Sequence, residues 1–179
     1  MFKKLNLFSK TEMKVLMYIS SKDGQLYERQ IADGAGISVG SANSILKSFS
    51  KIGLVNKMKK GRMSFYERND ENPLLRQFKV FVTVNNLMPV LQKIIPHSRR
   101  IILYGSCSIG RNTEESDIDL FILSSEKEDI RRILDNYRNI SSIILNSNEY
   151  LQLQKKDKPF YDRIVAGIEL YGGGHDRYL

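Results

Sequence analysis

The chain has 179 residues, of which 41% are hydrophobic and 27% charged, so it can form one domain or two small ones and has the polarity of a soluble protein. No apolar run approaches the roughly 20 residues that a membrane span needs, and the start is too interrupted for a signal peptide. A single cysteine excludes a disulfide framework and a cysteine-rich zinc site. Cytoplasm is therefore the expected compartment.

The positive charge is concentrated in the first part of the chain. Residues 1–72 hold 13 Lys and Arg against 7 Asp and Glu, a net charge of +6, while residues 73–179 hold 15 against 13, a net charge of +2. An excess of this kind in one part favours an acidic partner for that part, with nucleic acid the first candidate.

Residues 1–72 predict three helices followed by a hairpin. Ser9 with Glu12 is a capping box for a helix over 10–20. Helices over 27–35 and 39–52 follow, separated by a tight turn at 36–38. Two strands, 54–57 and 63–68, would be joined across the basic turn Lys59-Lys60-Gly61-Arg62.

The segments ERQIADGAGISVGSANSILKSFSKIGLV and MKKGRMSFYERN resemble the second and third helices and the wing of winged helix-turn-helix regulators. The resemblance implies double-stranded DNA as a partner. The third helix would present short polar groups to the major groove, and the wing would hold phosphates. The expected DNA-facing residues are Ser38, Ser41, Asn43, Ser44, Lys47, Lys57, Lys59, Lys60 and Arg62. A winged helix that contacts protein, with its lysines solvated, is the alternative.

Residues 73–97 are expected to form a connecting helix. Pro73 suits the first helical turn, and a broad apolar stripe runs from Leu74 to Leu87. Pro89 is expected to interrupt or kink the helix, with 90–95 as a continuation. Such a helix could bridge two domains or pair with its copy, and we expect a homodimer.

The candidate catalytic and ligand-binding residues lie in the stretch 101–123. Apolar runs at 101–104 and 120–123 predict neighbouring buried strands, with Gly105 and Ser106 after the first. Asp117 and Asp119 open the second strand. Because residues at i and i+2 share one face of a strand, both carboxylates would lie on that face, roughly 6–7 Å apart, with Ile118 in the core.

Two acids this close favour a divalent cation, and Mg²⁺ takes carboxylate, water and phosphate oxygens. A glycine lets backbone approach a ligand, and a helix starting near Ser106 would direct N–H groups at phosphate. Arg111 could neutralise phosphate charge. The pattern predicts a site for phosphoryl or nucleotidyl transfer. Ordinary turn and capping roles are the alternative. A P-loop is excluded because Arg111-Asn112 stands where Lys and Ser or Thr are required.

Tyr104-Gly105-Ser106 and Ser116-Asp117-Ile118-Asp119-Leu120 resemble the motif of the DNA polymerase beta nucleotidyltransferase superfamily, in its minimal branch. The resemblance covers roughly 98–172. It implies that Gly105 and Ser106 bind the nucleoside triphosphate, expected to be ATP, and that Asp117 and Asp119 are the catalytic residues and bind Mg²⁺.

The chain departs from this family at one position. Active members carry a third carboxylate on a later strand, and the matching strand here, 141–145, reads SSIIL. Asn146 and Glu149 are the nearest polar candidates. The departure puts catalysis in doubt and leaves binding of nucleotide and metal as expected. His97 and His175 have no partner at metal-ligand spacing and are expected at the surface.

The remaining pattern predicts helices over 125–138, 146–156 and 159–166 and strands over 141–145 and 168–171. The expected fold class is α+β: a winged helix-turn-helix over 1–72, a connecting helix over 73–97, and a small α/β nucleotidyltransferase domain with a mixed sheet over 98–179.

Three functions remain open at this point. The first is a DNA-binding regulator whose second domain binds nucleotide and Mg²⁺ and, if active, transfers a nucleoside monophosphate to an acceptor hydroxyl. The second is an inactive nucleotide sensor that regulates transcription. The third is an antitoxin-like protein that binds a protein partner.

Overall fold

The computed structural model describes residues 8–172. The chain divides into two compact units, Met1–Arg76 and Gln77–Leu179, and each is described here by itself. Among the described helices, none combines the length and the apolar character that a membrane crossing demands.

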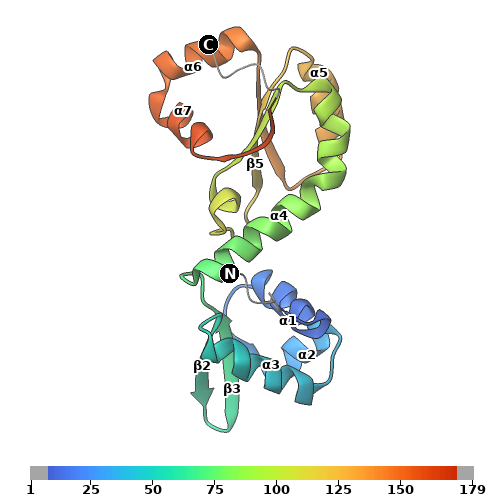
Figure 1. The fold of residues 1–179 in the computed structure, drawn as a ribbon, viewed down its shortest axis with the longest axis vertical. Coiled ribbons are helices and arrows are strands. Elements are labelled where there is room, and N and C mark those ends of the chain that lie inside the picture. Colours follow the sequence, from blue (N-terminus) through green and yellow to red (C-terminus); the bar gives the residue numbers. More distant parts are fainter. Residues whose placement is uncertain (1–7, 173–179) are drawn as a thin grey trace, which may run out of the picture. The chain divides into compact units, whose positions relative to one another are not determined.

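The first unit contains three helices and a three-stranded antiparallel sheet of order β1-β3-β2 (Figure 1). Its elements are α1 (Lys10–Ser20), β1 (Leu26–Tyr27), α2 (Glu28–Ala35), α3 (Val39–Lys51), β2 (Val55–Lys60) and β3 (Met63–Arg68). Ser9 and Glu12 form the predicted capping box of α1. Gly36, at a φ of 63°, ends α2 in the left-handed conformation that glycine adopts without strain. The two-residue strand β1 was not predicted.

The core of the first unit has buried residues from all three helices and from the position directly before β2. Leu16, Ile31, Leu46 and Leu54 are each 0% exposed. Arg68, at the end of β3, is also buried: its guanidinium forms ion pairs with Asp23 and Asp70. A buried charge is tolerated only when it is paired in this way. Three helices followed by a hairpin confirm the predicted winged helix-turn-helix.

The second unit is built on a four-stranded sheet of order β6-β5-β4-β7. β4 pairs antiparallel with β5 and with β7, and β5 pairs parallel with β6, so the sheet is mixed, as predicted. The elements from the end of the first unit onward are α4 (Pro73–Ile94), η1 (Ile95–His97), β4 (Arg100–Tyr104), η2 (Ser106–Ile109), β5 (Ile118–Leu123), α5 (Lys127–Leu134), β6 (Ile140–Leu145), α6 (Ser147–Lys156), α7 (Lys158–Val165) and β7 (Ile168–Gly172).

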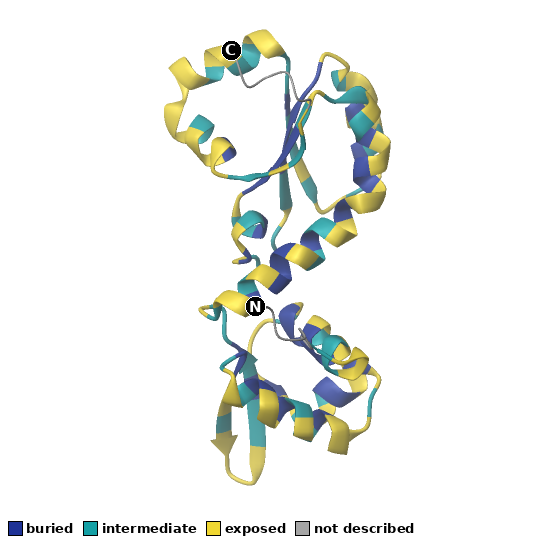
Figure 2. Ribbon diagram, in the orientation of Figure 1, coloured by how far each residue is buried: buried dark blue, intermediate teal, exposed yellow. Residues whose placement is uncertain are grey.

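Each face of this sheet is covered by a pair of helices. Alternate residues of β5 divide between two cores: Leu120 and Ile122 pack with residues of α4 and α5, and Phe121 and Leu123 pack with residues of α6 and α7. Figure 2 shows buried positions along β5 and α4. Because the strand alternates in this way, its first residues also present their side chains to opposite faces. This alternation sets the direction of Asp119.

Three predicted elements differ from those observed. α4 continues through Pro89, because the loss of one backbone hydrogen bond is offset by burial of Leu87, Val90 and Leu91 on the turns around it. α5 is shorter than the predicted 125–138. The helix expected near Ser106 is η2, a 3₁₀ segment of four residues.

Candidate functional site

Asp117 and Asp119 lie at the start of β5. Asp117 is the exposed residue immediately before the strand, and Asp119 is its partly buried second residue. Ile118, between them, packs against the core formed with α4 and α5. Asp119 is therefore on the other face of the sheet, towards α7, as the strand spacing predicts.

The pKa of Asp119 is raised above its usual value. Burial is the largest cause, and repulsion by the Asp117 carboxylate is the second. The Arg163 guanidinium acts in the opposite direction and lowers the pKa. Arg163 belongs to α7 and was not predicted as a site residue, because no local pattern links it to residues more than forty positions earlier. Two mutually repelling carboxylates near one arginine form a site that favours added positive charge.

Gly105 lies directly against Asp119. Its φ is 72°, and a Cβ built on it would lie 2.2 Å from Oδ2 of Asp119 and 3.2 Å from its Cγ. Any other residue would both strain the backbone and displace the carboxylate. The glycine of the predicted Gly-Ser pair is thus required by the position of the aspartate itself.

Ser106 begins η2, which is too short to carry the helix dipole expected from the sequence. The turn closes at Gly110, and the Arg111 N–H donates to the Ser106 carbonyl at 2.9 Å. This arrangement leaves Ser106 beside Gly105 and places Arg111, an exposed residue, at the end of the same loop. The helix dipole that the sequence predicts beside a bound phosphate is therefore not provided by η2.

The loop after η2 is held by α4. Lys79 is only 3% exposed, and its Nζ donates to the Asn112 carbonyl at 2.6 Å. Cys107 is buried in the same core, with its Sγ 3.5 Å from the Asp117 carbonyl. Burial, and then the charge of Asp119, raise the pKa of the Cys107 thiol, so it is a packed neutral residue. These contacts fix the loop between the glycine and the aspartates.

Within residues 8–172, the strand next to Asp119 offers no carboxylate at the position opposite it, where the family resemblance led us to look for a third acid. In the parallel ladder of β5 and β6, Ser141 stands opposite Asp119. Glu149 lies elsewhere, because it completes the capping box of α6 with Asn146 and forms an ion pair with Lys127. The Lys127 hydrogen bond is the largest cause that lowers the pKa of Glu149, followed by its backbone hydrogen bond at Asn146.

A separate group of possible metal ligands lies at His97. Its Nδ1 is 2.7 Å from Oε2 of Glu126, and Asp129 is close to both. Within residues 8–172 this is the one group of three His, Cys, Asp or Glu side chains with ligand atoms within 4.8 Å of one another. The expectation that His97 lacks a partner was therefore wrong, because Glu126 is 29 residues away in the sequence. His175 lies outside the described residues.

Asp117 and Asp119 nevertheless suit a divalent cation. They offer carboxylate oxygens, the ligand type that Mg²⁺ prefers, and their mutual repulsion raises the pKa of Asp119. A cation would relieve that repulsion. The residues present therefore fit the metal that the sequence predicts.

In the winged helix, the predicted residues of α3 divide into two groups. Ser41, Ser44 and Lys47 are exposed along the helix. Ser38 caps α3, its Oγ accepting from the Ser41 N–H at 3.2 Å. Asn43 instead donates to Oε1 of Glu28 at 2.7 Å, which ties its amide to α2.

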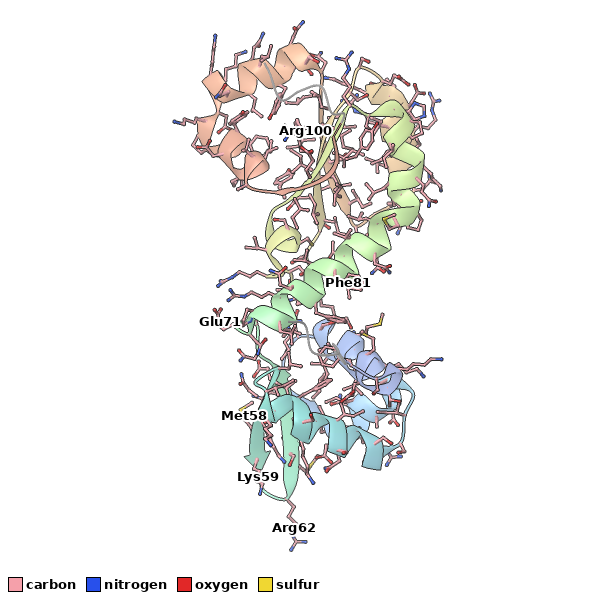
Figure 3. The ribbon with its side chains drawn as sticks, viewed as in Figure 1. Met58, Lys59, Arg62, Glu71, Phe81 and Arg100 are labelled. Atoms are coloured by element: carbon pink, nitrogen blue, oxygen red, sulfur yellow. The ribbon has the colours of Figure 1, made fainter. Side chains whose placement is uncertain are left out.

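The hairpin β2–β3 carries the predicted basic residues of the wing. Lys57 and Lys60 lie over the rings of Tyr66 and Phe65, with Nζ 5.5 and 5.4 Å from the ring centroids. Lys59 lies near the tip of the hairpin and Arg62 at its end (Figure 3). The turn is tighter than predicted, because Lys59 and Lys60 belong to β2.

Comparison with solved structures gives partial likenesses of fold. Sso10a-2, a DNA-binding protein from Sulfolobus solfataricus, is 19% identical, with a TM-score of 0.37 over 50% of this chain and 94% of that protein. TrmBL2, an archaeal chromatin protein, is 16% identical, with a TM-score of 0.34 over 86% of this chain and 69% of that one. Human N-acetylserotonin methyltransferase is 20% identical, with a TM-score of 0.31 over 34% of this chain; only 17% of that enzyme's length is covered.

No curated protein sequence matches the chain. Its residues 85–175, which include β4, the glycine–serine turn and both aspartates, match the family described as polymerase beta, nucleotidyltransferase. The match spans just over half of the 179 residues. The chain belongs to the polymerase beta nucleotidyltransferase family.

Proposed function

We propose that the protein is a DNA-binding regulator whose second unit binds a nucleoside triphosphate together with Mg²⁺. The observation that carries the nucleotide site is the contact of the Asp119 carboxylate with the Gly105 backbone, with Asp117 as its repelling neighbour. This contact brings the glycine–serine turn and the carboxylate pair to one corner of the sheet.

Each residue of this corner has a proposed role. Asp117 and Asp119 would hold the cation, Gly105 and Ser106 would lie against the phosphates, and Arg111 would neutralise phosphate charge. The cation supplies charge stabilisation on the phosphate oxygens when it is bound. Arg163, which lowers the pKa of Asp119, would provide a second positive charge on the α7 side. ATP is the first nucleotide to test.

A second candidate, a nucleotide sensor without turnover, is favoured by Ser141. This serine stands beside Asp119 where the family's third carboxylate is expected, and a hydroxyl neither binds a cation strongly nor accepts a proton at neutral pH. If the transferase is active, it would join the nucleoside monophosphate to an acceptor hydroxyl and release pyrophosphate.

Calorimetry and label transfer separate these candidates. Titration of ATP into the protein with and without Mg²⁺ should give saturable, cation-dependent binding, and Asp119→Asn should abolish it. Incubation with α-labelled ATP then tests transfer to protein or nucleic-acid acceptors. Label transfer that requires Asp117 and Asp119 means a transferase, and binding without transfer means a sensor. The absence of any cation-dependent binding would refute both.

DNA binding by the winged helix is supported by charge and exposure. Residues 1–72 carry the net +6, Ser44 and Lys47 are exposed on α3, and Lys59 and Arg62 are exposed on the wing. A gel-shift series on random-sequence duplexes at increasing salt would measure this binding without knowledge of the operator. Retardation that weakens steeply with salt is the expected result.

A further inference from the structure

One face of α4 exposes large apolar side chains at a regular interval. Leu74 is 41% exposed, Phe81 63% and Met88 47%. They are seven residues apart, and a rotation of 100° per residue brings positions separated by seven to nearly the same side of a helix. Phe81 is the most exposed of all the large hydrophobic residues in the described part of the chain (Figure 3).

The same face carries no exposed charge. Between Arg76 and Lys93 the single charged residue is Lys79, which is buried at 3% exposure. The cores of protein interfaces are depleted of charge and enriched in aromatic residues and methionine, so the composition is that of an interface.

The order of residues on this face is symmetric about Phe81. Leu74 and Met88 lie seven residues before and after it, and Gln77 and Asn85 lie four residues before and after it. Reversing the helix direction therefore exchanges an apolar residue with an apolar residue and an amide with an amide. We name these five residues the α4 stripe: Leu74, Gln77, Phe81, Asn85 and Met88.

We propose that the α4 stripe pairs antiparallel with the same stripe of a second copy of this chain. A two-fold interface requires residue i to meet residue j while j meets i. Here Phe81 would meet its copy on the two-fold axis, Leu74 would meet Met88, and Gln77 would meet Asn85. Amides can donate and accept, so the Gln77–Asn85 pairs bond to each other. Opposed helix dipoles also favour this direction.

The proposal is independent of nucleotide and DNA binding, and oligomeric state tests it directly. The molar mass of the full chain, measured by light scattering after size exclusion at micromolar concentration, should be that of a dimer. Phe81→Glu places two like charges on the axis and should give a monomer. Leu151→Glu, on α6 with a 59% exposed side chain, is the matched control and should remain dimeric. A monomeric wild type, or a dimeric Phe81→Glu variant, would overturn the proposal.

Charge pairs test the direction of pairing. In the antiparallel arrangement, Gln77→Lys combined with Asn85→Glu brings opposite charges together twice, so the double variant should dimerise at least as tightly as wild type. Gln77→Lys combined with Asn85→Lys should dissociate. A parallel dimer would pair like charges in both double variants. Dissociation of the Lys–Glu variant together with the Lys–Lys variant would therefore exclude the antiparallel arrangement.

Cysteine cross-linking gives a second measurement that does not depend on affinity. Phe81→Cys should form an intermolecular disulfide under mild oxidation, because the two positions meet on the axis. Met88→Cys should not, because the two copies of position 88 would be roughly 21 Å apart at 1.5 Å of rise per residue. The native Cys107 is buried, so wild type is the background control. Cross-linking at position 88 and not at 81 would contradict the proposal.

Discussion

The side chain of Asp119 lies so close to Gly105 that no Cβ fits at residue 105: a Cβ on the glycine would lie 2.2 Å from the aspartate Oδ2. The two residues belong to different segments, one directly after β4 and the other in β5. β4 and β5 are antiparallel neighbours, with Tyr104 opposite Asp119 in the ladder. The contact therefore follows from the register of the sheet, and the position of the Asp119 carboxylate requires a glycine at residue 105.

Gly105→Ala should consequently impair both folding and binding. The left-handed backbone and the collision with Asp119 should together lower the free energy of unfolding by about 1–3 kcal/mol and abolish Mg²⁺-dependent ATP binding. Urea unfolding and calorimetry measure the two effects. Gly61→Ala is the matched control, because Gly61 has a φ of 61° but nothing within 4 Å of its added Cβ. An equal loss of ATP binding in Gly105→Ala and Gly61→Ala would refute a specific role of the contact between Gly105 and Asp119.

Asp119→Asn should stabilise the protein in the absence of cation while removing its function. The folded state raises the pKa of Asp119, chiefly by burial, so it favours the protonated form. The associated stability is present below the carboxyl's ordinary pKa and is lost as pH rises through the folded-state value. At pH 7 the free energy of unfolding of the variant should be higher than that of wild type, and the difference should disappear near pH 3, where the wild-type carboxyl is protonated in both states. A difference independent of pH would contradict this.

Lys79→Met should loosen the loop that carries the site. The substitution keeps an apolar stem but leaves the Asn112 carbonyl without its lysine donor. An unsatisfied buried group costs about 1–3 kcal/mol, and loss of loop position should weaken ATP binding by about tenfold. Lys93→Met, at an exposed position of the same helix, is the control. Unchanged ATP affinity in Lys79→Met would show that the loop is held by its other contacts alone.

Tyr66 should give the winged helix an alkaline transition. Burial, and then its hydrogen bond to Glu28, raise the pKa of Tyr66 to about 12. The stability that the protonated phenol contributes is complete below its unfolded-state pKa near 10 and is lost as pH rises towards 12. Between pH 10 and 12, the free energy of unfolding of wild type should fall by on the order of 2 kcal/mol relative to that of Tyr66→Phe. Denaturant unfolding of both proteins from pH 9 to 11.5 measures this, and parallel curves would count against it.

Replacing Lys59, Lys60 and Arg62 with alanine should weaken DNA binding and reduce its salt dependence. Each lost phosphate contact should lower the slope of log K against log salt by about 0.9. Lys155→Ala, Lys156→Ala and Lys158→Ala together remove the same charge from exposed positions near α6 and α7, and this triple variant is the control. A slope unchanged in the wing variant would exclude the wing from the DNA contact.

The sequence by itself predicted the order of the main helices and strands and the candidate site residues at the corner of the sheet. Alternation along 117–123 placed Asp119 and Ile118 on opposite faces, and the capping box at Ser9 marked the start of α1. Such features are local, because strand and helix periodicities are set by neighbours within a few residues. The absence of an acid in SSIIL was also visible without coordinates.

Only the tertiary structure decided which distant residues complete these features. It brought Arg163 to Asp119, Glu28 to Asn43 and Lys79 to the loop after η2. It also left Phe81 uncovered while burying Leu87 on the same helix. These pairings depend on strand register and helix packing across tens of residues, which no local spacing encodes. The sequence thus predicted the candidate site residues, and the packing of the sheet determined which distant residues surround them.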